Sequence, residues 1–249
     1  MLVLLPPSET KRSGGFAQPL DLAQMSYSSL TPQREAVVRS LVALSDDPLS
    51  ATRVLKLGPK QIGEIEVNAT LRESPTMPAA DRYTGVLFDA LDAVSLDGAA
   101  RRWLSSHVRI QCAPFGLVGA LEKIPSYRLG ASASLPGLPS LKRVWADAVS
   151  AALHEASPRL LLDMRSEAYV ALGPVPATVP SVYVRVVSDS GEGEVRALNH
   201  FNKHAKGALV RLLATSRPRV STLPGLLRWA SSEGVNMRVT NDTEVLLIV

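Results

Sequence analysis

The sequence predicts one domain of the α+β or mixed α/β class, in which a mixed sheet is surrounded by helices. Apolar runs typical of strands stand at both ends of the chain, and helical patterns fill much of the sequence between them. No internal repeat and no linker divides the 249 residues. The composition, with 46% hydrophobic and 20% charged residues, is that of an ordered globule. We therefore expect a single domain over residues 1–249.

The first half of the chain is expected to begin with a strand and to continue mainly as helices. The apolar run Met1–Leu5 predicts a buried strand, because it stops at two prolines and is too short for the core of a signal peptide. Thr31-Pro32 and Asp47-Pro48 each place a capping side chain before a helix-starting proline. Further helices are expected at residues 83–94 and 97–105. Segments rich in Gly and Pro predict irregular structure at residues 57–80 and 113–137.

The second half is expected to alternate between helices and strands. Apolar residues at helical spacing predict helices at residues 141–153, 198–214 and 226–232. Strands are expected at residues 159–163, 181–187, 236–239 and 244–249. Asp189–Gly193 indicates a loose hairpin.

The distribution of charge is uneven. Residues 195–232 contain no Asp or Glu and carry seven cations: Arg196, Lys203, Lys206, Arg211, Arg217, Arg219 and Arg228. A segment of one sign attracts polyanions such as nucleic acid more than the formal net charge of +4 suggests. The alternative is a solvated helix face.

The expected helix at residues 198–214 has two different faces. One gathers apolar side chains and is expected to be buried: Leu198, Phe201, Ala205, Ala208 and Leu212. The other gathers Asn199, His200, Lys203, Lys206 and Gly207. Glycine is costly inside a helix, so Gly207 indicates a close approach to the backbone, for which we favour a ligand over a neighbouring helix. His200 and His204 are not expected to bind a metal, because lysines flank them and no third ligand is apparent.

Polar residues elsewhere follow apolar elements, where α/β proteins assemble their sites. We expect these candidate pocket residues to meet in space: Ser8, Glu9, Lys11, Tyr83, Arg128, Ser166 and Tyr169. Together they would suit a nucleotide-like or phosphorylated small molecule. Each one alone could equally be a cap or a turn residue.

A Leu-Pro-Gly-Leu sequence occurs twice, at residues 135–138 and 223–226, each near the start of an expected helix. It is similar to the hairpin of helix-hairpin-helix modules, whose backbone N–H groups meet a DNA phosphate. The second glycine of that hairpin is missing from both copies, so an ordinary turn is the alternative.

Several classes of site are excluded or unsupported. The sequence has no Gly-x-Gly-x-x-Gly, no Walker motif and no Gly-x-Ser-x-Gly. The lone Cys112 excludes an internal disulfide, and we expect it to pack in the core rather than act as a nucleophile. No apolar run approaches the ~20 residues that span a bilayer. We expect a cytoplasmic protein without a membrane segment, a metal or a cofactor.

The scattered motifs, in this order, resemble the YaaA family of bacterial peroxide-stress proteins. The resemblance rests on six segments: Leu5-Pro6-Pro7-Ser8, Tyr83-Thr84-Gly85-Val86, Phe115-Gly116 through Pro125-Ser126-Tyr127-Arg128-Leu129, Trp145, Ser166 with Tyr169, and Lys203-His204-Ala205-Lys206-Gly207. They are similar to that family's Ser-Pro-Ala-Lys-Thr, Tyr-Thr-Gly, Leu-Tyr-Gly…Tyr-Arg-Leu, Tyr-x-x-Trp, Ala-Ser-x-Glu-Tyr and Lys-x-Ala-Arg-Gly. The chain departs from these patterns at Lys206, Glu122, Phe115 and Ala168, where the family has Arg, Asp, Tyr and Glu.

The resemblance implies a YaaA-like fold with a basic cleft and a helix-hairpin-helix element, in a protein of DNA binding, DNA repair and iron control under peroxide stress. We therefore expect a partner of duplex or structured DNA, whose phosphates are contacted by Lys203, Lys206, Arg211 and Arg128. The competing hypothesis is an enzyme that uses the candidate pocket residues on a small-molecule ligand. A third hypothesis is an iron-handling or protein-binding role. The loss of a carboxylate at Ala168 and of a hydroxyl at Phe115 weakens the enzyme hypothesis, whereas DNA contact by charge does not need either group.

Overall fold

The centre of the molecule is a seven-stranded mixed sheet. The computed structural model describes residues 1–187 and 195–249, and the side chains of residues 1–187 and 201–249. The strands of the sheet are β1 (Leu2–Leu5), β3 (Val108–Cys112), β4 (Gly116–Gly119), β6 (Leu161–Asp163), β7 (Ser181–Val187), β8 (Met237–Asn241) and β9 (Glu244–Ile248). Their order is β4-β3-β1-β6-β7-β9-β8. The five central strands are parallel, and β4 and β8 close the edges as antiparallel strands.

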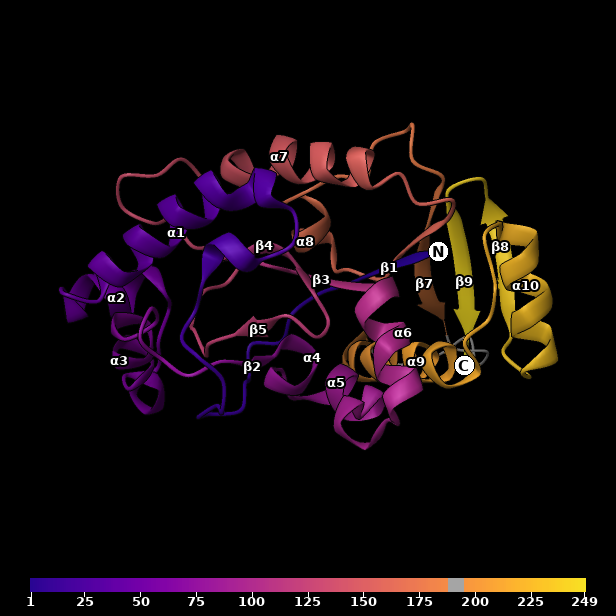
Figure 1. The fold of residues 1–249 in the computed structure, drawn as a ribbon, viewed down its shortest axis with the longest axis horizontal. Helices are drawn as coiled ribbons and strands as arrows, with labels where there is room; N and C mark the ends of the chain where they lie inside the picture. Colours follow the sequence, from indigo (N-terminus) through magenta and orange to yellow (C-terminus); the bar gives the residue numbers. More distant parts are fainter. Residues whose placement is uncertain (188–194) are drawn as a thin grey trace.

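Helices cover both faces of this sheet. They are α1 (Thr31–Leu44), α2 (Pro48–Val54), α3 (Glu64–Ala69), α4 (Ala79–Arg82), α5 (Val86–Leu91), α6 (Gly98–His107), α7 (Leu141–Ala156), α8 (Glu167–Val170), α9 (Val195–Ser216) and α10 (Leu223–Ser232). Short 3-10 turns lie at η1 (Leu22–Gln24), η2 (Ser28–Leu30), η3 (Pro59–Gln61) and η4 (Ala93–Ser95). In Figure 1, α7 runs along one side of the sheet, and α9 lies on the other side together with α5 and α6. The predicted mixed α/β class with a sheet surrounded by helices is confirmed.

The core is continuous across the sheet. The four residues of β1 are all buried, because parallel strands covered by helices on both faces leave no polar side. Trp145 of α7 is fully buried, and its ring nitrogen donates to the Ala113 carbonyl oxygen at 2.9 Å. The predicted first strand and the predicted helix start at Pro48 are confirmed. A helix also begins at the predicted Thr31-Pro32, but the predicted Thr31 cap is wrong, because Leu30 holds the N-cap position and no side chain caps α1. Asp47 caps α2 by accepting hydrogen bonds from the N–H groups of Leu49 and Ser50.

Two segments expected to be irregular contain regular structure. Residues 57–80 include α3 and the strand β2 (Met77–Pro78), and residues 113–137 include β4 and the strand β5 (Lys123–Ile124). β2 and β5 form a small antiparallel sheet of their own. These elements are two to six residues long and two of them carry Gly or Pro, so they are too short to show a periodic pattern. The expected hairpin at Asp189–Gly193 lies outside the described residues.

The predicted faces of α9 are wrong in part: Ala205 is buried and Lys203 is exposed as expected, but other positions differ. Phe201 is 64% exposed and Ala208 is exposed, whereas Gly207, Leu209 and Val210 are buried. Gly207 faces α5: a Cβ atom there would lie 2.0 Å from the Leu87 carbonyl oxygen. The close approach that Gly207 indicated is therefore made by a neighbouring helix and not by a ligand.

Neither Leu-Pro-Gly-Leu sequence joins two helices. Residues 135–138 form a turn that follows a non-helical segment and precedes the Ser140 cap of α7. Residues 223–226 are the first turn of α10, where the Thr222 hydroxyl accepts a hydrogen bond from the Gly225 N–H. The expected helix-hairpin-helix element is therefore not confirmed at either place, because one copy is a turn before the cap of α7 and the other is the first turn of α10.

Candidate functional site

The order of the strands leaves a crevice between the ends of β1 and β6. From β1 the chain crosses to β3 on one side, and from β6 it crosses to β7 on the other side. The loops that leave two neighbouring parallel strands therefore diverge, which is the arrangement in which α/β sheets bind ligands. The loop after β1 carries Pro7–Lys11, and the segment after β6 carries Ser166–Tyr169.

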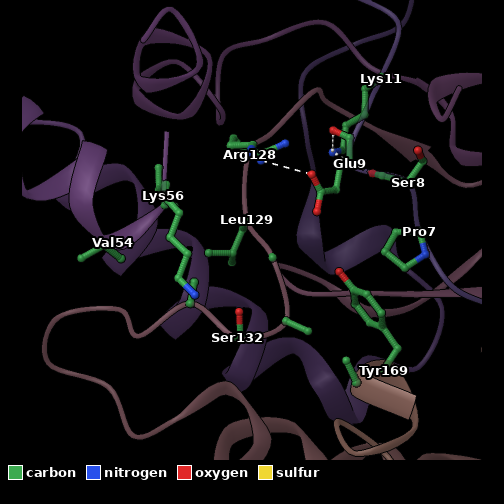
Figure 2. Close-up of a pocket in the computed structure, with 15 residues that line it drawn as sticks. Pro7, Ser8, Glu9, Lys11, Val54, Lys56, Arg128, Leu129, Ser132 and Tyr169 are labelled. Atoms are coloured by element: carbon green, nitrogen blue, oxygen red, sulfur yellow. Dashed lines mark hydrogen bonds and ion pairs between the residues drawn. The ribbon is translucent and has the colours of Figure 1, made fainter. Parts of the chain in front are cut away.

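A cavity of about 450 Å³ lies in this crevice, and we call it the Arg128 pocket. The loop after β1, the end of α2, the segment 128–133 and α8 all contribute to its wall. Its charged residues are Glu9, Lys11, Lys56 and Arg128, so three cations accompany one carboxylate. Figure 2 shows Lys56 and Arg128 coming from different segments, with Arg128 joined to Glu9 and the Tyr169 hydroxyl pointing toward the space from below this pair.

Asn68 of α3 fixes the position of Arg128. Its side-chain amide donates to the Arg128 carbonyl oxygen at 2.9 Å, and its amide oxygen accepts from the Arg128 N–H at 2.8 Å. Asn68 itself is fully buried. The guanidinium of Arg128 then donates to Glu9 at 3.3 Å, in an ion pair whose Glu9 side chain is 82% exposed. An ion pair this open to water is weak, so an anionic ligand could take the place of Glu9.

Lys11 lies against the aromatic floor of the pocket. Its Nζ donates to the carbonyl oxygens of Ser8 and Glu9 at 3.1 and 3.2 Å and lies 4.1 Å from the centre of the Tyr127 ring. Burial lowers the pKa of Lys11 to about 8. Below the lysine, the hydroxyls of Tyr83 and Tyr127 are 2.6 Å apart. The pocket thus holds an amine that a bound anion would keep protonated.

Tyr169 presents an uncharged hydroxyl to the pocket. Burial raises the pKa of this phenol, as it does for Tyr83 and Tyr127. Figure 2 shows the Tyr169 hydroxyl pointing into the space. At neutral pH it is available both as a donor and as an acceptor of hydrogen bonds.

A second cavity, of about 520 Å³, adjoins the first, and we call it the Lys206 pocket. Its polar lining consists of Ser166, Glu167, Tyr183, Arg185, Asn202, Lys203 and Lys206. The Lys206 Nζ donates to the Met164 carbonyl oxygen at 3.1 Å and lies 5.2 Å from the centre of the Tyr183 ring. Burial lowers the pKa of Lys206 to about 8. Ala168 lines both cavities, so the two sets of cations stand on either side of the same short helix, α8.

The structure brings together most of the candidate pocket residues. Ser8, Glu9, Lys11, Arg128 and Tyr169 line the Arg128 pocket. Ser166 lines the adjacent Lys206 pocket, and Tyr83 is buried beneath Lys11 without reaching either cavity.

The four residues expected to contact phosphates are divided. Arg128, Lys203 and Lys206 line the two pockets. Arg211 lines neither one: its guanidinium donates to the carbonyl oxygens of Leu91 and Asp92 and to the Ser95 hydroxyl, all at 2.9 Å. Arg211 therefore caps the carboxyl end of α5, and a phosphate would have to displace these bonds. The position of Arg211 is better explained by its hydrogen bonds to the end of α5 than by contact with DNA.

Sequence reasoning missed Lys56, Asn68 and Arg185. Lys56 follows the last turn of α2 in a left-handed conformation with φ of 54°, and Arg185 forms an ion pair with Glu244 at 2.9 Å. None of the three stands in a recognisable motif. In the sequence, Asn68 cannot be told from any other polar helix residue. Only its hydrogen bonds to the backbone of Arg128 set it apart.

The residues that the structure describes offer neither a metal-binding cluster nor a membrane-spanning helix. There, no group of three or more His, Cys, Asp or Glu side chains could hold a metal ion. In the same part of the chain, no helix combines the length and the apolar character required to cross a bilayer.

Comparison with known proteins decides the family. The family model described as "Peroxide stress protein YaaA" matches residues 1–236. The chain belongs to the YaaA family of peroxide stress proteins. A UPF0246 protein of Corynebacterium efficiens is 45% identical over 229 residues, which cover 90% of this chain and 89% of the relative. A UPF0246 protein of Corynebacterium glutamicum is 40% identical over 254 residues, which cover all of both chains. A UPF0246 protein of Streptomyces coelicolor is 40% identical over 222 residues, which cover 86% and 84%.

Two of the departures from the YaaA motifs lie outside the pockets. Phe115 is fully buried against Tyr127, with the ring centres 5.6 Å apart. Glu122 accepts hydrogen bonds from the N–H groups of Ser26 and Gly119, so it holds the loop together. Ala168 is different, because it stands where the two pockets meet. An apolar residue there leaves the junction without the negative charge that a glutamate would add.

Proposed function

We propose that this YaaA family member binds DNA in the cytoplasm as part of a role in peroxide stress, and that the contacts are made by cations around α8. Membership of the peroxide stress family supports the role in peroxide stress. The observation that supports DNA binding is the pair of adjoining pockets, whose linings contain six cations and two carboxylates. An anionic backbone laid across Ala168 would meet cations on both sides.

The cations come from separate elements, which suits a ligand with repeated charges. Lys56 follows α2, Arg128 lies in an extended segment, and Lys203 and Lys206 belong to α9. Lys56 and Lys203 are exposed, so they can follow a flexible polyanion, while Arg128 is held in place by Asn68. Lysine and arginine contacts to phosphates release counterions, which gives affinity without a preference for base sequence.

Salt dependence tests this proposal. The logarithm of the binding constant for a duplex should fall with the logarithm of the salt concentration at a slope of roughly −0.9 for each phosphate contact. The double variant Lys56→Asn and Lys203→Ala should flatten that slope by about two units and weaken binding at low salt. Asparagine is chosen at position 56 because it tolerates the left-handed backbone there.

The matched control is Lys60→Ala with Lys142→Ala. Both lysines are exposed and line neither pocket, and the control removes the same formal charge. Its slope should stay close to that of the unmodified protein. A pocket variant that keeps the full affinity and slope, or a control that loses as much as the pocket variant, would refute the proposed surface.

A further inference from the structure

The Arg128 pocket is a cavity of small-molecule size. Its volume of about 450 Å³ lies within the roughly 300–1,000 Å³ of ligand pockets. Residues 128–133 form one wall of the cavity, and the loop that carries Ser8 and Glu9 forms another. Phosphates along a duplex need only surface cations, so a cavity of this volume is not explained by contact with a DNA backbone alone.

The three cations of the pocket are arranged to bind one anionic group of a ligand. The guanidinium of Arg128 and the Lys56 ammonium reach in from different segments, and the Lys11 amine lies deeper, over the Tyr127 ring. Arg128 is already bound to a carboxylate, Glu9, at 3.3 Å. Because Glu9 is largely exposed, a phosphate that binds more tightly can replace it without leaving a buried charge unpaired.

The rest of the lining suits a group that is partly polar and partly apolar. Pro7, Val54 and Leu129 supply apolar surface, and hydroxyls of Ser8, Ser132 and Tyr169 supply donors and acceptors. A phosphate beside cations, a polar sugar and a heteroaromatic base make up a nucleotide. We propose that the Arg128 pocket binds one nucleotide, with the phosphate at Arg128 and Lys56 and the base against the apolar wall.

Such a nucleotide could come from two sources, a free mononucleotide or a single nucleotide extruded from a DNA strand. Enzymes and repair proteins that read a base outside the duplex hold it in a pocket of this kind. The second source rests on the proposed DNA function, whereas the first does not. The experiment therefore has one arm for each source.

The variant that tests the pocket is Ser132→Trp. Ser132 is exposed and lines the pocket, so a tryptophan side chain there fills the cavity without changing the charge or disturbing the core. Ser134→Trp is the matched control, because Ser134 is exposed in the same segment but does not line the cavity. Equal melting temperatures would show that both variants fold.

In the first arm, deoxynucleoside monophosphates are titrated into the full chain in a calorimeter. In the second, a duplex with a bulged 2-aminopurine nucleotide is titrated and its fluorescence is compared with that of a fully paired duplex. Ser132→Trp should lower the mononucleotide affinity, or the change in 2-aminopurine fluorescence, at least about tenfold, and Ser134→Trp should leave both unchanged. Inorganic phosphate at the same concentration should bind more weakly than the mononucleotide.

The outcomes separate the two proposals. Binding of the mononucleotide alone assigns the pocket to a free nucleotide, and a fluorescence change confined to the bulged duplex assigns it to DNA. If paired DNA binds with the expected salt slope while neither arm responds, the nucleotide pocket is refuted and the DNA proposal stands. If Ser132→Trp and Ser134→Trp behave alike, the nucleotide binds elsewhere and the inference fails.

Discussion

Asn68 satisfies both backbone polar groups of Arg128 from a fully buried position. At the scale of single residues, this is the contact that turns an extended segment into one wall of the pocket. The ion pair between Arg128 and Glu9 depends on it, because the guanidinium can reach the loop after β1 only while its backbone is held near α3. A charged residue of the pocket is thus positioned by one that has no charge.

We expect Asn68→Ala to lower the free energy of unfolding by about 2–4 kcal/mol. The substitution leaves two backbone groups of Arg128 without partners, and each buried group without a hydrogen bond costs roughly 1–3 kcal/mol. Urea denaturation measures the change. An alanine variant as stable as the unmodified protein would show that water replaces both bonds.

At the scale of elements, the pair α5 and α9 sets the position of the Lys206 pocket. Gly207 lets the backbone of α5 approach α9, and Arg211, one turn further along, caps the carboxyl end of α5. This packing leaves Lys203 exposed and turns Lys206 towards Met164 and Tyr183. The sequence predicted that Gly207 and Arg211 contact a ligand. In the structure, Gly207 packs against α5 and Arg211 caps it.

Gly207→Ala should destabilise the protein by at least about 2 kcal/mol, because the added Cβ would lie 2.0 Å from the Leu87 carbonyl oxygen and α5 would have to move. On an isolated helix the same change would stabilise. Gly63→Ala is the control, since no atom lies within 4 Å of its Cβ position and its φ is −60°. Thermal melting of the two variants gives the comparison, and a neutral Gly207→Ala would show that α5 can shift without cost.

At the scale of the whole molecule, two half-buried lysines, Lys11 and Lys206, make the free energy of unfolding depend on pH. Burial lowers the pKa of Lys11 and of Lys206 to about 8 from the ordinary 10.5, so the unfolded chain holds more protons than the folded one between these values. Stability should therefore rise as the pH increases from about 8. Cys112, whose pKa is raised to about 11, and the buried tyrosines, whose pKa is also raised, oppose this rise above about pH 9 to 10.

Denaturant melts at pH 7 and pH 9 test this expectation. The free energy of unfolding should increase by about 1–2 kcal/mol between them, and the double variant Lys11→Met with Lys206→Met should lose most of that increase. The same variant should be more stable than the unmodified protein at pH 7, because it no longer buries two charges. A gain at pH 9 that persists in the double variant would place its origin in other groups.

Local signals in the chain predicted much of the architecture. The apolar run at Met1–Leu5, the prolines after Thr31 and Asp47, and the spacing around Trp145 each depend on neighbours in sequence, and each of these elements formed as expected. The mixed α/β class followed from them. Family membership could also be anticipated, since short motifs in a fixed order survive in the sequence itself.

What tertiary structure decided was which side chains face each other. Phe201 was expected to be buried and is exposed, and Gly207 was expected on the polar face and is buried. The reason is that α9 has apolar residues on more than one side, and only the contact with α5 selects the buried side. Asn68 and Arg128 are 60 residues apart in sequence and meet only because α3 packs beside the segment that follows β5, while Lys56, at the end of α2, lines the same pocket as Arg128. The spacing of apolar residues reports the environment of one helix or strand, whereas several elements together form a pocket. The sequence therefore predicted candidate residues but not that they would line two separate cavities.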